Sequence, residues 1–314
     1  MTVRAVTAVY DIRRSSEGDG RQIADYFAWL NRTLALPVPF TIFLDPATEH
    51  PPLATKPGDV VIPLPWTELA ALRWRAQVEE VCRHAEQFPS WRDLTYRLPA
   101  YQLLMFSKFE FFERVAANTA AESLVWIDAG ASRFSDWDYS RLRLREEFAS
   151  RLAAHADLAV SARHHLRDYY HGRPAPSFPG LCQTLTNGTA FLVKTSAAAR
   201  LRRVIDEHVE SNWLAHDLWD TEQTALCEII LAGKMQTAIV AETFNWIGLL
   251  GVLFKPIDAM SFGQRWDQNA TSRQRPLVRR AGDVLKANII KTYRSARYGR
   301  PVDEIAAIIP GPRA

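Results

Sequence analysis

The sequence has little cysteine and no long apolar run. Its three cysteines, Cys82, Cys182 and Cys227, are odd in number and widely spaced, so they predict neither a disulfide framework nor a zinc site. The most apolar stretch, residues 239–254, is interrupted by polar residues and is shorter than the roughly 18 residues of a membrane span. The N-terminus carries no basic leader with an apolar stretch behind it. We therefore expect a cytoplasmic protein with reduced thiols.

Repeats and low-complexity segments are also missing. Hydrophobic residues make up 47% of the chain and charged residues 23%, which is typical of a globular protein with a packed core. This composition excludes disordered, collagen-like and coiled-coil proteins. The length of 314 residues fits either two domains or one α/β domain with a C-terminal extension.

Short apolar runs alternate with amphipathic stretches over most of the chain. We expect strands at 3–9, 40–44, 60–64, 123–127 and 236–240, and helices at 22–36, 67–88, 101–118, 196–209 and 221–231. Residues 182–194 predict two short strands joined by a tight hairpin at Asn187-Gly188. The loop 171–179, rich in proline, is a candidate lid. The alternation predicts an α/β fold with a mostly parallel sheet and helices on both faces.

Ligands of such sheets bind beyond the carboxyl ends of the strands. Asp128 ends the strand 123–127 and precedes two small residues, so its carboxylate would face this crevice beside a ligand. Such a carboxylate suits a divalent cation that bridges to a diphosphate, or it simply caps a turn. After the strand 3–9, Tyr10 could stack on a base or belong to the core, and Arg13 could pair with a diphosphate.

Lys108 falls on the apolar face of the helix 101–118. The polar face of that helix would be formed by Gln102, Ser107, Glu110, Glu113 and Arg114. An unpaired buried ammonium would cost several kcal/mol, so Lys108 must have a partner. It either reaches the surface, pairs with a structural acid such as Glu110 or Asp138, or reaches a ligand phosphate or the crevice at Asp128.

Several of these residues together resemble the HtrL/YibB family of bacterial proteins, which is similar to GT-A glycosyltransferases. The resemblance covers roughly residues 3–240, and its parts are Tyr10-Asp11-Ile12-Arg13, Lys108, Trp126-Ile127-Asp128-Ala129-Gly130 and Arg133. It implies a GT-A-like sheet that binds a nucleotide sugar in residues 1–250, followed by a basic helical extension in 251–314. The donor-binding residues that it implies are Tyr10, Asp11, Arg13, Lys108, Asp128, Gly130, Arg133, Asn187 and Gly188.

The resemblance places Asp128 at the first acid of the glycosyltransferase Asp-x-Asp motif. Gly130 stands where the second acid would be, and no histidine follows His216 to complete a metal shell. Asp128 is then either the ligand of a manganese or magnesium cofactor or a contact to the ribose or sugar.

Asp220-Thr221-Glu222-Gln223 opens the helix 221–231 and resembles an acidic element beside the acceptor site of GT-A enzymes. The resemblance implies that Glu222, or Asp220 in its place, deprotonates an acceptor hydroxyl. The alternative is a capping box between Asp220 and Gln223. The resemblance also brings Asn187-Gly188 to the donor sugar, unless these two residues are only a turn.

Basic residues gather near the C-terminus. Between Thr271 and Arg300 there are nine basic residues and one acid, a net +8, which leaves −5 for the remainder of a chain of net charge +3. Apolar residues recur there at helical intervals (Val284, Leu285, Ile289 and Tyr293). The segment either contacts an anionic membrane or docks on the protein with its cations in water.

The resemblance, taken with these residues, implies a glycosyltransferase that moves a sugar from a nucleotide-diphosphate donor to a hydroxyl of a bacterial surface-polysaccharide precursor. The acceptor would be a lipopolysaccharide, O-antigen or capsule precursor, free or lipid-linked, at the inner face of the cytoplasmic membrane. The alternative is a non-catalytic protein that binds a nucleotide sugar or a polysaccharide precursor. A nucleic-acid partner is not expected.

Overall fold

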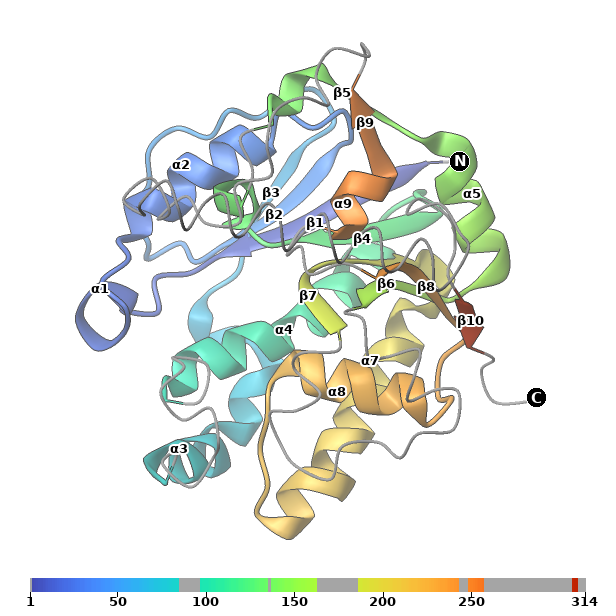
Figure 1. The fold of residues 1–314 in the computed structure, drawn as a ribbon. Helices are drawn as coiled ribbons and strands as arrows, with labels where there is room; N and C mark the ends of the chain where they lie inside the picture. The colour runs from blue at the N-terminus through green and yellow to red at the C-terminus, as the bar shows by residue number, and fades with distance from the viewer. Residues whose placement is uncertain are drawn as a thin grey trace, which may run out of the picture.

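A mostly parallel sheet is the centre of the computed structural model, which describes residues 2–84, 97–134, 137–162, 186–242, 248–256 and 307–309 (Figure 1). The sheet has eight strands in the order β3-β2-β1-β4-β7-β6-β8-β10. Strand β7 runs antiparallel to β4 and β6, β10 runs antiparallel to β8, and the other neighbouring pairs are parallel. The strands are β1 (Val3–Val9), β2 (Phe40–Leu44), β3 (Val60–Pro63), β4 (Ser123–Ile127), β6 (Leu158–Ala162), β7 (Thr186–Lys194), β8 (Thr237–Glu242) and β10 (Ala307–Ile309).

Helices cover both faces of this sheet, as predicted. One face carries α3 (Arg75–Arg83), α4 (Pro99–Ala116), α7 (Ala198–His208) and α8 (Glu222–Leu231), which lie together in Figure 1. The opposite face carries α2 (Ile23–Thr33), α5 (Glu146–His155) and α9 (Gly248–Leu253). Alternate residues of β1 point to opposite faces, so Val6 and Ala8 enter the first core and Val3 and Ala5 the second. The α/β class and the helices on both faces are therefore confirmed.

Helix α4 is buried around most of its circumference, which differs from the amphipathic helix that the sequence predicts. Gln102, Ser107 and Glu110, expected on a polar face, are all buried. The reason is that α4 packs against the sheet, α3, α7 and α8 at once. A helix enclosed on this many sides holds its side chains, Lys108 among them, in fixed positions.

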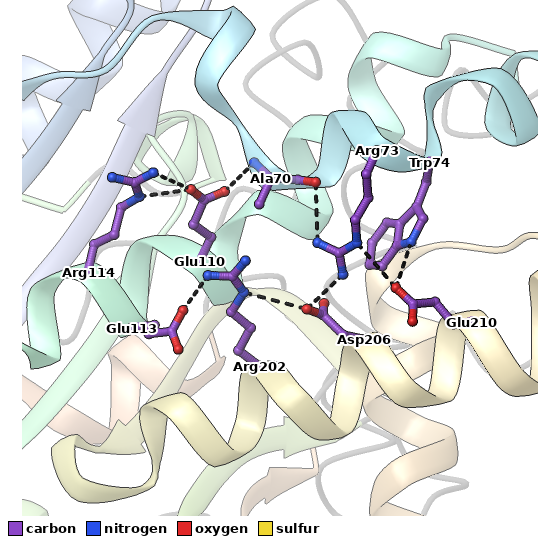
Figure 2. A network of polar contacts seen from close by, with 9 residues as sticks. All are labelled: Ala70, Arg73, Trp74, Glu110, Glu113, Arg114, Arg202, Asp206 and Glu210. Atoms are coloured by element: carbon purple, nitrogen blue, oxygen red, sulfur yellow. Dashed lines mark hydrogen bonds and ion pairs between the residues drawn. The ribbon is translucent and has the colours of Figure 1, made fainter.

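A network of ion pairs fastens α4 to its neighbours (Figure 2). Glu110 accepts a hydrogen bond of 2.7 Å from the backbone N–H of Ala70 and pairs with Arg114 at 2.7 Å. Arg202 of α7 pairs with Glu113 of α4 and with Asp206. Arg73 pairs with Asp206 and Glu210, and the indole of Trp74 donates to Glu210. Glu110 is therefore not the partner of Lys108.

The predicted hairpin at Asn187-Gly188 is wrong. Both residues lie inside the single strand β7, which pairs with β4 through residues 190–194 and with β6 through residues 186 and 191–193. The local turn signal of an Asn-Gly pair is overridden here by the tertiary context, which includes a close contact with α8 at Gly188.

Other differences concern the ends of elements. The predicted helix 67–88 starts with two 3-10 turns, Trp66–Glu68 and Ala70–Trp74, before α3.

Cys82 and Cys227 are free thiols. The candidate lid 171–179, Cys182 and the basic segment 271–300 lie outside the described residues.

Described residues on the C-terminal side of position 250 pack against the rest. Strand β9 (Phe254–Pro256) pairs with β5 (Leu142–Leu144) in a second, two-stranded sheet, and β10 forms the edge of the main sheet. Leu253 and Phe254 are buried in the core beside α5. The division at residue 250 stays a prediction, since most of 251–314 is not described. In the described part of the chain no helix is long and apolar enough to cross a membrane.

Candidate functional site

A pocket opens at the carboxyl ends of β1 and β4. Strand β1 has β2, the next strand of the chain, on one side and β4 on the other, so the strand order reverses between β1 and β4. Crevices at such reversals are where open α/β sheets bind ligands. The pocket and its open mouth together hold about 750 Å³ of space that no protein atom fills. Its wall includes residues 8–12 and 128–130, three arginines (Arg14, Arg21 and Arg133), and the aromatic residues Tyr26, Tyr101 and Trp126.

Asp128 stands at the bottom of this pocket. Its backbone N–H donates to Thr189 of β7 at 2.9 Å, which extends the β4–β7 pairing by one residue and fixes the carboxylate. Its Oδ1 accepts hydrogen bonds from the indole of Trp126 at 2.5 Å and from the ammonium of Lys108 at 3.1 Å. The side chain is 29% exposed, and Oδ2 receives no hydrogen bond from the described residues. Asp128 thus offers one carboxylate oxygen to a ligand.

Lys108 lies directly behind Asp128. Besides Asp128, its Nζ contacts Glu222 Oε1 at 2.8 Å and the carbonyl of Gly188 at 3.1 Å. Only 1% of the side chain is exposed, and Lys108 is not part of the pocket wall. Burial acts to lower the pKa of Lys108, but the carboxylates of Asp128 and Glu222 outweigh it and raise this pKa above its ordinary value. Lys108 is therefore a buried cation that pairs with Asp128 and Glu222 and does not itself line the pocket.

Gly188 makes this cluster sterically feasible. A Cβ at this position would lie 2.5 Å from Glu222 Oε1 and 2.8 Å from the Cγ of Gln223, closer than real contacts allow. Gln223 in turn accepts a hydrogen bond of 3.2 Å from the N–H of Gly188. Gly188 therefore serves the contact between β7 and α8, beneath the pocket.

Arg14 and Arg21 line the pocket and share one acid, Asp19, which is not part of the pocket wall. Arg14 donates two hydrogen bonds to Asp19, at 3.2 and 2.7 Å, and its guanidinium lies 5.0 Å from the ring centre of Tyr101. Arg21 contacts the same carboxylate of Asp19 at 3.2 Å. Two guanidinium groups against one carboxylate leave a positive charge here.

Arg133 has no acid partner among the residues that the structure describes. Its guanidinium lies over the rings of Phe134 and Trp29, at 4.3 and 5.6 Å from their centres. Burial, together with the nearby charge of Arg21, lowers the pKa of Arg133. The hydroxyl of Tyr26, also in the pocket wall, is buried without a hydrogen-bond partner in the described structure. Gly130 lies between these groups.

Four of the predicted donor-binding residues do not line the pocket: Arg13, Lys108, Asn187 and Gly188. Tyr10 is among the lining residues, but its side chain is buried. Tyr10 belongs to the core, where its hydroxyl donates to the carbonyl of Leu64 at 2.9 Å and its ring stacks on Phe111. Burial raises its pKa. The side chain of Arg13 is 76% exposed, pairs with Glu17 and is not part of the pocket wall. The pocket instead receives its neighbour Arg14, because Arg13 adopts a left-handed conformation with φ of 58° that turns the chain.

The two candidate bases are buried away from the pocket. Glu222 is 3% exposed and Asp220 2% exposed, and neither lines the pocket. The predicted capping box between Asp220 and Gln223 is not formed, because Thr221 is the N-cap of α8 and accepts from the N–H of Thr224 at 3.3 Å. Asp220 instead accepts from the N–H of Thr221 at 2.6 Å.

The described residues do not suit a divalent cation at Asp128. Within the described ranges no group of three or more His, Cys, Asp or Glu side chains could hold a metal ion. Gly130, two residues after Asp128, offers no side-chain ligand, and an ammonium group already contacts Asp128 Oδ1. A metal at this carboxylate would also face the repulsion of Lys108.

Sequence reasoning missed Arg14, Arg21, Tyr26 and Tyr101, which carry no motif. Of the predicted donor-binding residues, the pocket wall brings together Tyr10, Asp11, Asp128, Gly130 and Arg133, and their contact with a donor stays a prediction. No model of a protein family matches the chain, and no curated protein matches it either.

Proposed function

We propose that the protein is a glycosyltransferase of GT-A-like fold that takes a sugar from a nucleotide-diphosphate donor. The observation that carries this proposal is the juxtaposition, in one pocket at the strand-order reversal, of the Asp128 carboxylate and three arginines. A ligand that fits must offer hydroxyl groups to the carboxylate and negative charge to the guanidinium groups. A nucleotide sugar has both. The acceptor in this proposal is a hydroxyl of a bacterial surface-polysaccharide precursor.

The proposed chemistry depends on positioning and on charge. Arg14, Arg21 and Arg133 stabilise the negative charge that grows on the diphosphate as the bond to the sugar breaks. The free Oδ2 of Asp128 accepts a hydrogen bond from a hydroxyl of the sugar or ribose and thereby orients the reacting carbon. Aromatic rings beside these groups, among them Tyr101 and Trp126, exclude water from the pocket.

Lys108 and Glu222 act behind the pocket as positioning residues. Lys108 holds Oδ1 of Asp128, while Glu222 and the carbonyl of Gly188 hold Lys108. A general base must come within hydrogen-bond reach of the proton that it removes. Since Glu222 is enclosed behind Asp128 and paired with Lys108, we assign it to this support and not to the acceptor.

The alternative proposal is a non-catalytic protein that binds a nucleotide sugar. The buried position of Glu222 and Asp220 favours it, because both acids expected to act on the acceptor are directed into the protein. Turnover separates the two proposals, since a binding protein does not release free nucleotide from the donor.

The proposal is tested by incubating the full chain with a panel of nucleotide sugars and measuring both binding heat and nucleotide release. We expect at least one donor to bind saturably and to be cleaved slowly, by transfer to water or to an added saccharide. Asp128→Asn should keep the fold and lose most of the cleavage. Saturable binding without cleavage, with or without acceptor, would favour the binding protein. Absence of binding to every donor would overturn both proposals.

Contact with an anionic membrane and a position at its inner face stay predictions. The segment 271–300 on which they depend lies outside the described residues.

A further inference from the structure

Arg133 is the most unusual charge in the pocket. A guanidinium that is largely removed from water is normally held by a carboxylate, because a desolvated charge without a partner is costly. Arg133 contacts two aromatic rings and no carboxylate of the described structure. Its five N–H donors therefore remain available to a ligand with negatively charged oxygens.

Gly130 lies close against this guanidinium, with little room for a side chain. A Cβ on Gly130 would lie 3.1 Å from Nη1 of Arg133, 3.5 Å from the ring of Trp29 and 3.6 Å from the ring of Tyr26. These three side chains therefore surround the position where any other residue would carry a side chain. The unpartnered hydroxyl of Tyr26 belongs to the same pocket wall and can donate to the same ligand.

The charge of the pocket wall suits a diphosphate. Arg14, Arg21 and Arg133 carry three positive charges, and Asp19 is the acid that pairs with two of them. The remaining acid at the pocket mouth is Asp11, an exposed residue whose Oδ1 accepts from the N–H of Arg13. Asp128, at the bottom, is already in contact with the ammonium of Lys108.

We propose that Arg133 and Tyr26, which lie beside Gly130 in the pocket wall, bind a phosphate group of the donor, and that the pocket holds a diphosphate without a divalent cation. This inference rests on the proposed function and names how the donor is held. Guanidinium groups supply the charge that a metal ion would otherwise supply. Lys108 already pairs with Asp128, so its positive charge would repel a metal ion at this carboxylate.

The test is calorimetric titration of the full chain with inorganic pyrophosphate, first with a chelator and then with manganese. We expect the same dissociation constant in both, within about twofold. Arg133→Gln should weaken binding by about tenfold or more, the effect of one charge-assisted hydrogen bond or two. Arg133→Lys should recover part of the loss, and Tyr26→Phe should weaken binding by about fivefold. Arg203→Gln, which changes an arginine that is 68% exposed on α7, is the matched control and should bind as the parent does.

Three results would overturn the inference: no pyrophosphate binding by the parent, binding that requires manganese, or unchanged binding by an Arg133→Gln protein with a native circular-dichroism spectrum. Binding only with manganese would leave the proposed function standing, because a metal-dependent transferase would behave so. A different result would be pyrophosphate binding without metal, combined with no binding of any nucleotide sugar. The phosphate subsite would then stand and the proposed function would fail.

Discussion

The ammonium of Lys108 lies 3.1 Å from Oδ1 of Asp128, so a buried cation from α4 supports the carboxylate that faces the pocket. The same ammonium is 2.8 Å from Glu222 at the start of α8. One lysine thus joins the end of β4 to two helices on the same side of the sheet. The position of the Asp128 carboxylate and the stability of the fold therefore both depend on Lys108.

Lys108→Met should destabilise the protein by about 3–5 kcal/mol, because it leaves the carboxylates of Asp128 and Glu222 without their cation. Urea unfolding followed by circular dichroism measures this loss. The double variant Lys108→Met/Glu222→Gln should recover part of it, since one of the two orphaned charges is then removed. A single variant as stable as the parent would show that the cluster contributes little to stability.

Gly188→Ala should destabilise the protein by about 1–3 kcal/mol through overpacking. The new methyl group would lie 2.5 Å from Glu222 Oε1, so either β7 or α8 has to move. Asp128 is hydrogen-bonded to β7 through Thr189, and donor binding should weaken as well. The midpoint of urea unfolding and the donor affinity are the two measurements. An unchanged midpoint would mean that β7 and α8 can move apart at this contact with little loss of stability.

Neighbouring arginines should differ in their effect on donor binding. Arg14 lines the pocket and is 11% exposed, whereas Arg13 points to solvent. Arg14→Gln should weaken the binding of a nucleoside diphosphate by about tenfold, and Arg13→Gln by less than about twofold. Titration of both variants with the same ligand gives a matched comparison. The reverse order would contradict the assignment of Arg14 to the pocket.

Stability should fall in alkaline solution. Burial and the negative charge of Glu222 raise the pKa of Tyr101 from 10.0 to about 12, and the pKa of Lys108 is raised as well. Since both groups hold their protons more tightly in the folded state, the unfolded state loses protons first as the pH rises. Their contribution is complete below pH 10 and is lost as the pH approaches 12. Urea midpoints measured between pH 8 and 11 should stay level and then decline.

Tyr101→Phe provides the control for this pH dependence. Removal of the hydroxyl should make the alkaline decline less steep, because one of the groups with a raised pKa is gone. An equally steep decline in the variant would assign the effect to other groups.

The sequence was sufficient to predict five strands of the sheet (β1, β2, β3, β4 and β8) and part of the site. Alternating apolar runs identify β1, β2 and β4, and the position of Asp128 at the end of an apolar strand identifies the crevice. The need of Lys108 for a partner also follows from its place on an apolar face. Each of these features can be recognised from a short stretch of sequence, either an apolar run or the helical spacing of apolar residues.

What the sequence could not predict depends on contacts between distant segments. The left-handed conformation of Arg13, which brings Arg14 into the pocket, is not encoded by a glycine. The Asn-Gly signal at 187 and 188 is typical of a turn, whereas its glycine serves a close approach between β7 and α8. Glu222 resembles an exposed helix-capping or catalytic acid until Lys108, 114 residues away in sequence, is placed beside it.

The most direct measurement of the central claim is calorimetric titration of the parent and of Arg133→Gln with a panel of nucleotide sugars and the matching nucleosides. We expect saturable binding of at least one nucleotide sugar by the parent, a loss of about tenfold or more in the variant, and little change for the matching nucleoside. Absence of saturable binding to every nucleotide sugar, or an equal loss for sugar nucleotide and nucleoside, would contradict the account of this pocket as a donor site.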